Sequence, residues 1–278
     1  MSVLAGSVPV VAMSEVALLP GASVWTVDCC AKHPGWSDVE VRGDHRLVLV
    51  RGGRFLRRIG RCESTVDQTV AYLGVPGEAE QFAHPAGGDR CTSIGVRPEL
   101  WRSLAGEHWV LARSDVYVDA SVDLLHRRLL RAGRTSDIQF ALAEEVVRLV
   151  AVAALAASRE RSSAHRRGGL PDAAVAAAAR AAILDDEPGS HGLLPLAHRI
   201  GVSPFALSRA CSAVMGISLT RYRNRVRVGR ALARIEAGDR DLACLAADLG
   251  FSDQAHLTRT IRVHLGETPT ALRTLLSA

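Results

Sequence analysis

Two common sequence signals are missing from this chain of 278 residues. The first residues, MSVLAGSVPVVAMSEVALLPGA, have no basic start, and their apolar run is interrupted. We therefore expect neither a secretory signal peptide nor a membrane span. The six cysteines lack the spacing of a secreted disulfide framework, so we expect reduced thiols in a cytoplasmic protein. Met13 is an alternative start, and residues 1–12 are expected to form a disordered extension.

Lysine is nearly absent as well, since Lys32 is the only lysine among 34 basic residues. Genomic base composition can produce such a bias, so the excess of arginine does not by itself indicate a function. The net charge of +5 and the pI near 9.1 are compatible with an anionic partner. A hydrophobic content of 48% excludes wholesale disorder, and the length allows two ordinary domains.

Strand patterns occupy the region from about Ala22 to Val96. The segment RLVLVRGGRFLRRIG has two β-prone runs on either side of Gly52 and Gly53, which predicts a hairpin. Short apolar runs broken by Pro-Gly and Gly-Gly continue to residue 96. Several short strands with glycine-rich turns predict a small antiparallel barrel or sandwich.

Helical spacing begins in the middle of the chain, in SVDLLHRRLLRAG and SDIQFALAEEVVRLVAVAALAASRE. The second segment predicts a helix from about Asp137 to Ser158. Its apolar surface is unusually wide and comprises Phe140, Leu142, Val146, Val147, Val150, Val152 and Leu155. Such a surface either packs against the preceding helix or forms a dimer interface, and the sequence leaves both interpretations open. The charged, small residues of 159–172 predict a linker.

A motif of about 20 residues then occurs twice, as LAHRIGVSPFALSRACSAVMG (196–216) and LAADLGFSDQAHLTRTIRVHLG (245–266). Each copy predicts a helix-turn-helix unit. Gly201 and Gly250 end the first helices, and Ser203 in one copy and Ser252 or Asp253 in the other cap the second helices. The predicted buried side of the second helices consists of Leu207, Cys211, Val214, Leu257, Ile261 and Leu265.

The outer side of these second helices carries side chains that can read DNA. Arginine can bind guanine, glutamine can bind adenine, and serine or threonine can bind a base or a phosphate. A helix that presents them fits the major groove. The predicted DNA-binding residues are Phe205, Ala206, Ser208, Arg209, Ser212, Gln254, Ala255, His256, Thr258, Arg259 and Arg262. The arginine-rich connector SLTRYRNRVRVGRALARIEAG is expected to add two or three phosphate contacts, with Arg223 and Arg225 as the candidates.

These residues resemble the AraC/XylS family of transcription regulators over about Leu193 to Arg273. The segments ALSRACSAVMGISLTRYRNRVRVGRALARI and LAADLGFSDQAHLTRTIRVHLGETPTALR carry the resemblance. It implies two helix-turn-helix units, joined by a long helix, that place their recognition helices in successive major-groove segments. The family usually has phenylalanine at the positions of Cys211, Leu257 and Ile261.

Many members of that family carry an N-terminal cupin-like barrel that binds an effector, and HPGWSDVE and PGEAEQFAHP resemble its motifs loosely. The expected fold class is α+β, with a small N-terminal β-barrel, further helices, and an all-α C-terminal domain. The expected divisions are the extension 1–12, the effector domain 13–120, a helical dimerisation segment 121–158, the linker 159–172 and the DNA-binding domain 173–278.

Two patches in the strand-rich half carry candidate chemistry. The first holds Cys29, Cys30, His33 and Glu40, and the second holds His84, Asp89 and Cys91. Thiolate, imidazole and carboxylate groups bind Zn²⁺ or a similar soft ion if the barrel brings the patches together. An exposed thiol could instead sense oxidants or electrophiles. In a third interpretation these residues are structural and an organic effector binds elsewhere in the barrel. All three stay open.

The sequence favours a non-enzymatic, sequence-specific DNA-binding transcription regulator that senses a small-molecule or metal effector. Its expected partners are double-stranded DNA, the effector and a second copy of the chain, with no membrane. The alternative is a cysteine-based DNA alkyl-acceptor, or repair, protein with a regulatory DNA-binding domain, which would use Cys29, Cys30, Cys62 and Cys91. These cysteines lack a compact Cys-x-x-Cys arrangement. A metal-dependent cupin enzyme is a third choice, for which the strands offer few clear ligands.

Overall fold

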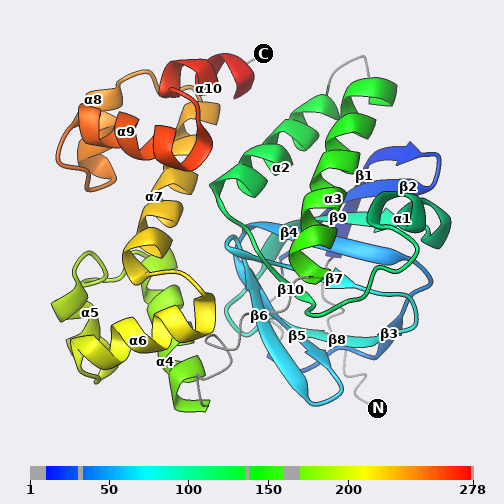
Figure 1. Ribbon diagram of the computed structural model, residues 1–278, viewed down its shortest axis with the longest axis horizontal. Helices are drawn as coiled ribbons and strands as arrows, with labels where there is room; N and C mark the ends of the chain where they lie inside the picture. Colours follow the sequence, from blue (N-terminus) through cyan, green and yellow to red (C-terminus); the bar gives the residue numbers. More distant parts are fainter. Residues whose placement is uncertain (1–10, 31–33, 135–137, 159–169, 277–278) are drawn as a thin grey trace, which may run out of the picture. The chain divides into compact units, whose positions relative to one another are not determined.

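The computed structural model describes residues 11–30, 34–134, 138–158 and 170–276, and the chain divides into two compact units. Unit 1 spans Met1–Arg159, and unit 2 spans Glu160–Ala278. Unit 1 is a curled antiparallel sheet with helices packed on it, and the described part of unit 2 is helical (Figure 1). The α+β fold class is confirmed.

Unit 1 forms a half-barrel from one curled sheet rather than a closed barrel. In the described residues the sheet has the order β1-β2-β9-β4-β7-β6-β5-β8-β3, and β10 pairs with β7. Every pairing is antiparallel. The strands are β1 Val11–Leu19, β2 Ala22–Cys29, β3 Glu40–Val41, β4 His45–Gly52, β5 Arg54–Ile59, β6 Cys62–Asp67, β7 Val70–Gly74, β8 Ala79–Ala83, β9 Asp89–Val96 and β10 Asp115–Tyr117. The expected extension 1–12 differs from this structure at Val11 and Ala12, which already belong to β1.

The predicted hairpin at Gly52 and Gly53 is wrong. Strand β4 is hydrogen-bonded to β7 and β9, whereas β5 is hydrogen-bonded to β6 and β8. The chain therefore turns a corner between two parts of the sheet. Gly53 has a φ of +73°, and a Cβ at this position would lie 2.3 Å from the carbonyl oxygen of Gly88. Glycine is needed here because two backbone segments approach closely. In the sequence, such a glycine cannot be distinguished from the glycine of a hairpin turn.

Side chains of alternate residues in β4 and β9 face opposite sides of the sheet, and both sides are buried. Leu47 and Leu49 of β4 belong to the core beneath the helices, whereas Val48 and Val50 belong to a second apolar cluster on the other side. The same alternation places Ile94 of β9 under the helices. Because antiparallel neighbours share a face, the second cluster marks a continuous inner surface of the half-barrel.

The helices of unit 1 cover one face of the sheet (Figure 1). They are α1 Pro98–Ala105, α2 Ala120–Ala132, the π-helical segment η1 Ile138–Leu142, and α3 Ala143–Ser158. One buried polar contact joins α2 to the sheet, where His126 Nε2 lies 2.8 Å from Thr92 Oγ1. Burial lowers the pKa of His126 to about 3, so the imidazole is neutral at physiological pH.

The wide apolar surface of α3 has two parts. Leu142, Val146 and Val150 are buried in the core of unit 1, as expected for packing against the preceding helix and the sheet. A second set is exposed on the same segment and comprises Phe140, Val147, Val152 and Leu155. The interpretation as core is therefore right for the first set, and only the second set is available to a partner.

Unit 2 consists of the helices α4 Leu170–Leu184, α5 Leu193–Ile200, α6 Pro204–Met215, α7 Leu219–Glu236, α8 Leu242–Asp248, α9 Gln254–Leu265 and α10 Pro269–Leu276. Helix α4 begins inside the expected linker 159–172, of which residues 159–169 lie outside the described residues. Helices α5 and α6 form one helix-turn-helix unit, and α8 and α9 form the other. Among the helices that the structure describes, none has the length and apolar character needed to cross a bilayer.

The burial of α3 leads to a stability prediction. Val150 is 0% exposed, so Val150→Asp would place an unpaired charge in the core and should lower the free energy of unfolding of unit 1 by about 3–5 kcal/mol. Val110→Asp, at a position that is 71% exposed, is the control and should change this free energy by less than about 0.5 kcal/mol. Urea denaturation followed by circular dichroism measures both, and equal stabilities would contradict the placement of α3.

Candidate DNA-binding surface and ligand pocket

The second helix of the first helix-turn-helix unit, α6, starts at a well-formed cap. Ser203 Oγ accepts a hydrogen bond from the backbone NH of Ala206 at 3.1 Å, and Pro204 occupies the first turn. Leu207 and Cys211 are fully buried, as predicted for the inner side. On the other side Phe205, Ser208, Arg209 and Ser212 are exposed and Ala206 is half-buried.

Helix α9 repeats this arrangement in the second unit. Asp253, rather than Ser252, caps it, and its Oδ1 accepts from the backbone NH of His256 at 2.6 Å. The inner side is formed by Leu257 and Ile261, which are fully buried. The predicted residues that are exposed are Gln254, Ala255, Arg259 and Arg262, while His256 and Thr258 are half-buried.

The cap of α9 also restrains His256. Its Nδ1 lies 3.1 Å from Ser252 Oγ, and its ring meets the ring of Phe251 edge to face at a centroid distance of 5.3 Å. The Nε2 atom is left as the group that this histidine can offer to a base. Arg209 is restrained less. Its guanidinium lies 3.3 Å from Asp172 Oδ1, and an exposed ion pair of this kind contributes little free energy.

The arginines of α7 are largely used inside unit 2. Arg225 is 2% exposed, so the prediction that it contacts phosphate is wrong: it has no surface to offer. Arg223 is half-buried and donates from Nη1 to the carbonyl oxygen of His191. Arg230 donates to the carbonyl oxygens of Ile183 and Leu184 at 3.1 and 3.2 Å, which caps the C-terminal end of α4.

Arg227 links α7 to the turn of the second helix-turn-helix unit. Its Nη2 donates to the carbonyl oxygen of Gly250, and its guanidinium lies 5.0 Å from the ring centroid of Phe251. A Cβ at Gly250 would lie 2.7 Å from the same Nη2 atom. The glycine therefore serves both the left-handed turn and the approach of Arg227, so the long helix and the turn are held together.

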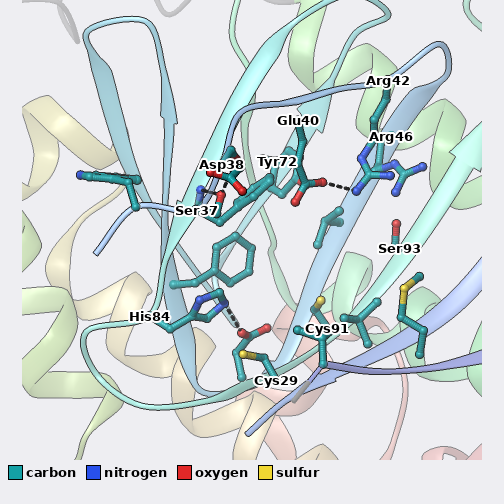
Figure 2. A pocket seen from close by; sticks show the side chains of 18 residues that line it. Cys29, Ser37, Asp38, Glu40, Arg42, Arg46, Tyr72, His84, Cys91 and Ser93 are labelled. Carbon is teal, nitrogen blue, oxygen red and sulfur yellow. Dashed lines mark hydrogen bonds and ion pairs between the residues drawn. The ribbon is translucent and has the colours of Figure 1, made fainter. Parts of the chain in front are cut away.

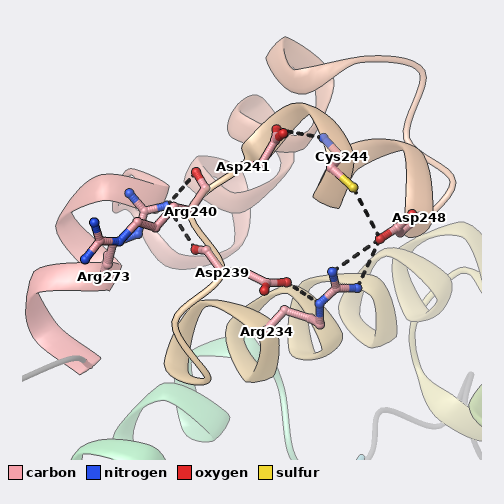
Figure 3. Close-up of polar contacts among 7 residues, drawn as sticks. All are labelled: Arg234, Asp239, Arg240, Asp241, Cys244, Asp248 and Arg273. Atoms are coloured by element: carbon pink, nitrogen blue, oxygen red, sulfur yellow. Dashed lines mark hydrogen bonds and ion pairs between the residues drawn. The ribbon is translucent and has the colours of Figure 1, made fainter.

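A second group of contacts surrounds α8 (Figure 3). Arg234 bonds to Asp239, and both of its terminal nitrogens lie 3.2 Å from Asp248 Oδ2. Asp241 caps α8, accepting from two backbone NH groups at 2.9 and 3.0 Å. Arg273 of α10 donates to the carbonyl oxygens of Asp239 and Arg240 at 3.1 and 3.2 Å. Arg234 and Arg273 thus connect α7 and α10 to the α8 region, although the ion pairs of Arg234 are exposed and of small net value.

The inner surface of the half-barrel in unit 1 lines a pocket of about 610 Å³ (Figure 2). Its aromatic wall is built by Phe55, Tyr72 and Phe82, whose rings lie 5.9–6.2 Å apart. The Arg57 guanidinium lies 4.2 Å from the Tyr72 ring centroid, and Arg57 Nε donates to Glu80 Oε1 at 2.7 Å. This buried network supports the wall, and burial raises the pKa of Tyr72 well above its usual value.

The two ends of the pocket differ in chemistry (Figure 2). Glu40, Arg42 and Arg46 lie at one end, where Arg42 is paired with Glu40 and Arg46 Nη2 lies 3.0 Å from Asp44 Oδ2. Cys29, His84 and Cys91 lie at the other end, which we call the pocket floor together with Asp89. The pocket is therefore amphipathic, with a charged rim, an aromatic wall and a sulfur-containing floor.

The pocket floor brings together part of the predicted sensing set. His84 Nε2 lies 2.8 Å from Asp89 Oδ1, and Cys29, His84 and Asp89 offer ligand atoms that all lie within 4.8 Å of one another. Cys91 is adjacent on β9. Burial raises the pKa of the Cys91 thiol above its usual range, with a further contribution from the nearby Asp89 carboxylate.

The pocket floor does not include every described member of the predicted set. Cys30 is exposed, and His33 lies outside the described residues. Glu40 of the first patch lies at the opposite end of the pocket. Sequence reasoning did not select Arg46 or Tyr72 as pocket residues, although strand alternation was the signal that could have found them once the inner face of β4 was known.

Comparison with known proteins gives one family match and several solved structures of low similarity. Residues 196–274 match the family model described as a helix-turn-helix domain. Among solved structures, ToxT from Vibrio cholerae O395 is similar with 9% identity and a TM-score of 0.34, covering 93% of this chain and 99% of that one. No curated protein is significantly similar to the chain.

Two further solved structures are similar over smaller shares of the chain. The C-terminal domain of AraT, a response regulator from Geobacillus stearothermophilus, has 21% identity and a TM-score of 0.36 over 40% of this chain and 90% of its own. A cupin superfamily protein from Desulfitobacterium hafniense has 12% identity and a TM-score of 0.28 over 31% and 77%. The family match covers the two repeated units described above, so residues 196–274 form a helix-turn-helix domain.

Proposed function

We propose that the chain is a sequence-specific regulator whose DNA binding responds to a ligand held in the half-barrel, and that it acts as a homodimer. The observation that carries the specificity is the pair of recognition helices α6 and α9. Each presents an exposed arginine beside exposed polar or small residues, over a fully buried apolar side. Arg209 and Arg259 are the candidate guanine readers, and Gln254 is the candidate adenine reader.

The same surface distinguishes readers from weaker contributors. Ala206 and Ala255 have no hydrogen-bonding side chain, so they can contribute only apolar contacts, such as one to a thymine methyl group. Ser208, Ser212 and Arg262 remain candidates for phosphate or base contacts because they are exposed. Arg225 is buried and Arg223 is bonded to a backbone carbonyl. We therefore assign the phosphate contacts to residues of α6 and α9 instead of to these two arginines of α7.

The pocket supports the effector part of the proposal. A volume of about 610 Å³ is within the range of small-molecule sites, and its apolar wall with a few convergent polar groups is their usual composition. The pocket lies on the face of the sheet opposite to α2 and α3. A ligand that orders the inner face can therefore alter the packing of these helices through strands that both faces share.

The homodimer part rests on the exposed apolar set of η1 and α3. Phe140 is 76% exposed and Leu155 is 54% exposed, and Val147 and Val152 lie between them in sequence. An exposed stripe of this kind on a helix that is otherwise anchored in the core favours a helix-to-helix contact. A second copy of the chain is the occupant that we propose.

The alternative of an alkyl-acceptor protein gains no support from the arrangement of the thiols. Cys29 and Cys91 are buried in the pocket floor, Cys30 is exposed, and Cys62 is exposed at the turn between β5 and β6. Titrating the thiols before and after exposure to alkylated DNA would test the alternative directly, and loss of a thiol on that exposure would favour it.

The first prediction of this proposal concerns base reading. Arg209→Ala and Arg259→Ala should each weaken specific binding by about 1–3 kcal/mol, because each removes a bidentate contact to guanine. Arg102→Ala, an exposed arginine in unit 1, is the control and should leave the affinity unchanged. Fluorescence anisotropy with an operator selected from random DNA measures all three, and wild-type affinity in both recognition-helix variants would refute the assignment.

The second prediction concerns the dimer. Leu155→Asp should convert the protein to a monomer without unfolding it, because the charge would lie in the proposed interface and not in the core. Val110→Asp places the same charge at another exposed apolar position and should leave the dimer intact. Equilibrium sedimentation of the full chain distinguishes the two, and a monomeric wild-type protein at micromolar concentration would contradict the interface.

A further inference from the structure

The pocket floor has the composition of a metal site. Cys29 offers a sulfur, His84 a ring nitrogen and Asp89 a carboxylate oxygen, and these ligand atoms all lie within 4.8 Å of one another. Bonds of about 2.0–2.3 Å from a tetrahedral Zn²⁺ place its ligand atoms about 3.3–3.8 Å apart. The three groups therefore need to move by only about 1 Å to close around an ion.

Strand register holds two of these groups opposite each other. Cys29 of β2 pairs with Asp89 of β9, so both side chains lie on the inner face of the half-barrel. Val27 and Cys91 are the next pair on that face, two residues along each strand. The backbone thus presents a sulfur and a carboxylate side by side without depending on a flexible loop.

Two glycines tighten this corner of the fold. A Cβ at Gly88 would lie 1.9 Å from the carbonyl oxygen of Cys29, and a Cβ at Gly53 would lie 2.3 Å from the carbonyl oxygen of Gly88. Three backbone segments are therefore in direct contact around the floor. Such a contact is possible only without side chains, and it fixes Cys29 against the segment that carries Asp89.

The polar groups of the floor also fit a cation. The side chain of Asp89 is 3% exposed, and its Oδ1 atom accepts no hydrogen bond of good geometry although His84 Nε2 lies 2.8 Å away. A bound cation would stabilise a buried carboxylate oxygen that lacks a well-formed hydrogen bond. The side chain of His84 is 18% exposed and faces the pocket, which provides a path for entry.

We propose that Cys29, His84 and Asp89 bind a soft divalent cation of the Zn²⁺ class, with a fourth coordination position open to the pocket. The combination of thiolate, imidazole and carboxylate is a ligand set for such ions, and hard cations such as Mg²⁺ prefer oxygen alone. Three protein ligands with one open position allow an exogenous donor to complete the site. This inference deepens the proposed function. It rests on that function only where it gives the ion a role in regulation.

The test uses the full chain, stripped with a chelator and titrated with Co²⁺ and Zn²⁺. We expect one ion per chain and a thiolate-to-cobalt charge-transfer absorption, which reports sulfur coordination directly. Cys29→Ser should abolish this absorption, and His84→Gln and Asp89→Asn should each weaken Zn²⁺ binding at least about 10-fold. Cys30→Ser is the matched control, an exposed thiol one residue away, and should bind both ions as the wild type does.

Circular dichroism shows whether each variant is folded. Asp89→Asn, which changes charge and not size, keeps the test valid if Cys29→Ser fails to fold. Wild-type affinity for Zn²⁺ in the folded His84→Gln and Asp89→Asn variants, or cobalt binding without the sulfur band, would overturn the assignment. Failure of the proposed function would differ from this result, since the protein would then bind Zn²⁺ but no operator.

Discussion

The strict alternation of side chains along β4 and β9 is the constraint on which unit 1 depends. Leu47 and Leu49 are buried under the helices, and Val48 and Val50 are buried on the inner face. A shift of register by one residue would exchange these two sets between the helix-covered face and the pocket face, and neither would then fit its neighbours. The same alternation assigns Cys91 to the pocket, so one property of the sheet sets the helix packing and the composition of the pocket.

Unit 2 depends on a different principle, the interior use of arginine. The guanidinium group offers five NH donors in a fixed plane, and in this unit they bind carbonyl oxygens at helix ends and turns. Arg227 reaches the carbonyl of Gly250, and Arg230 reaches the end of α4. These two arginines of α7 therefore stabilise the packing of that helix against the second helix-turn-helix turn and against α4.

Much of the structure of the helix-turn-helix units could be predicted from the sequence, because it depends on local chemistry. The helix ends at Gly201 and Gly250, the cap at Ser203 and the buried sides at Leu207 and Leu257 follow from spacing and capping. Because the motif occurs twice, each of these sequence features is present in two copies. Arg225 was misassigned because a charged residue on a helix looks the same in sequence whether it is exposed to water or buried within the domain. The hairpin at Gly53 was misassigned because a glycine required for a close contact resembles a turn glycine.

The sequence alone determined the classes of element, the two helix-turn-helix units and the pool of Cys, His and Asp residues in the strand-rich half, because these depend on residue type and short-range spacing. Only the tertiary structure decided which of them meet. It brought Cys29 to Asp89 across the β2–β9 ladder and His84 from the preceding loop, and it left Cys30 exposed. It also divided α3 into a buried and an exposed side. Those outcomes depend on strand order and register, which join residues about 60 positions apart and which no local pattern encodes.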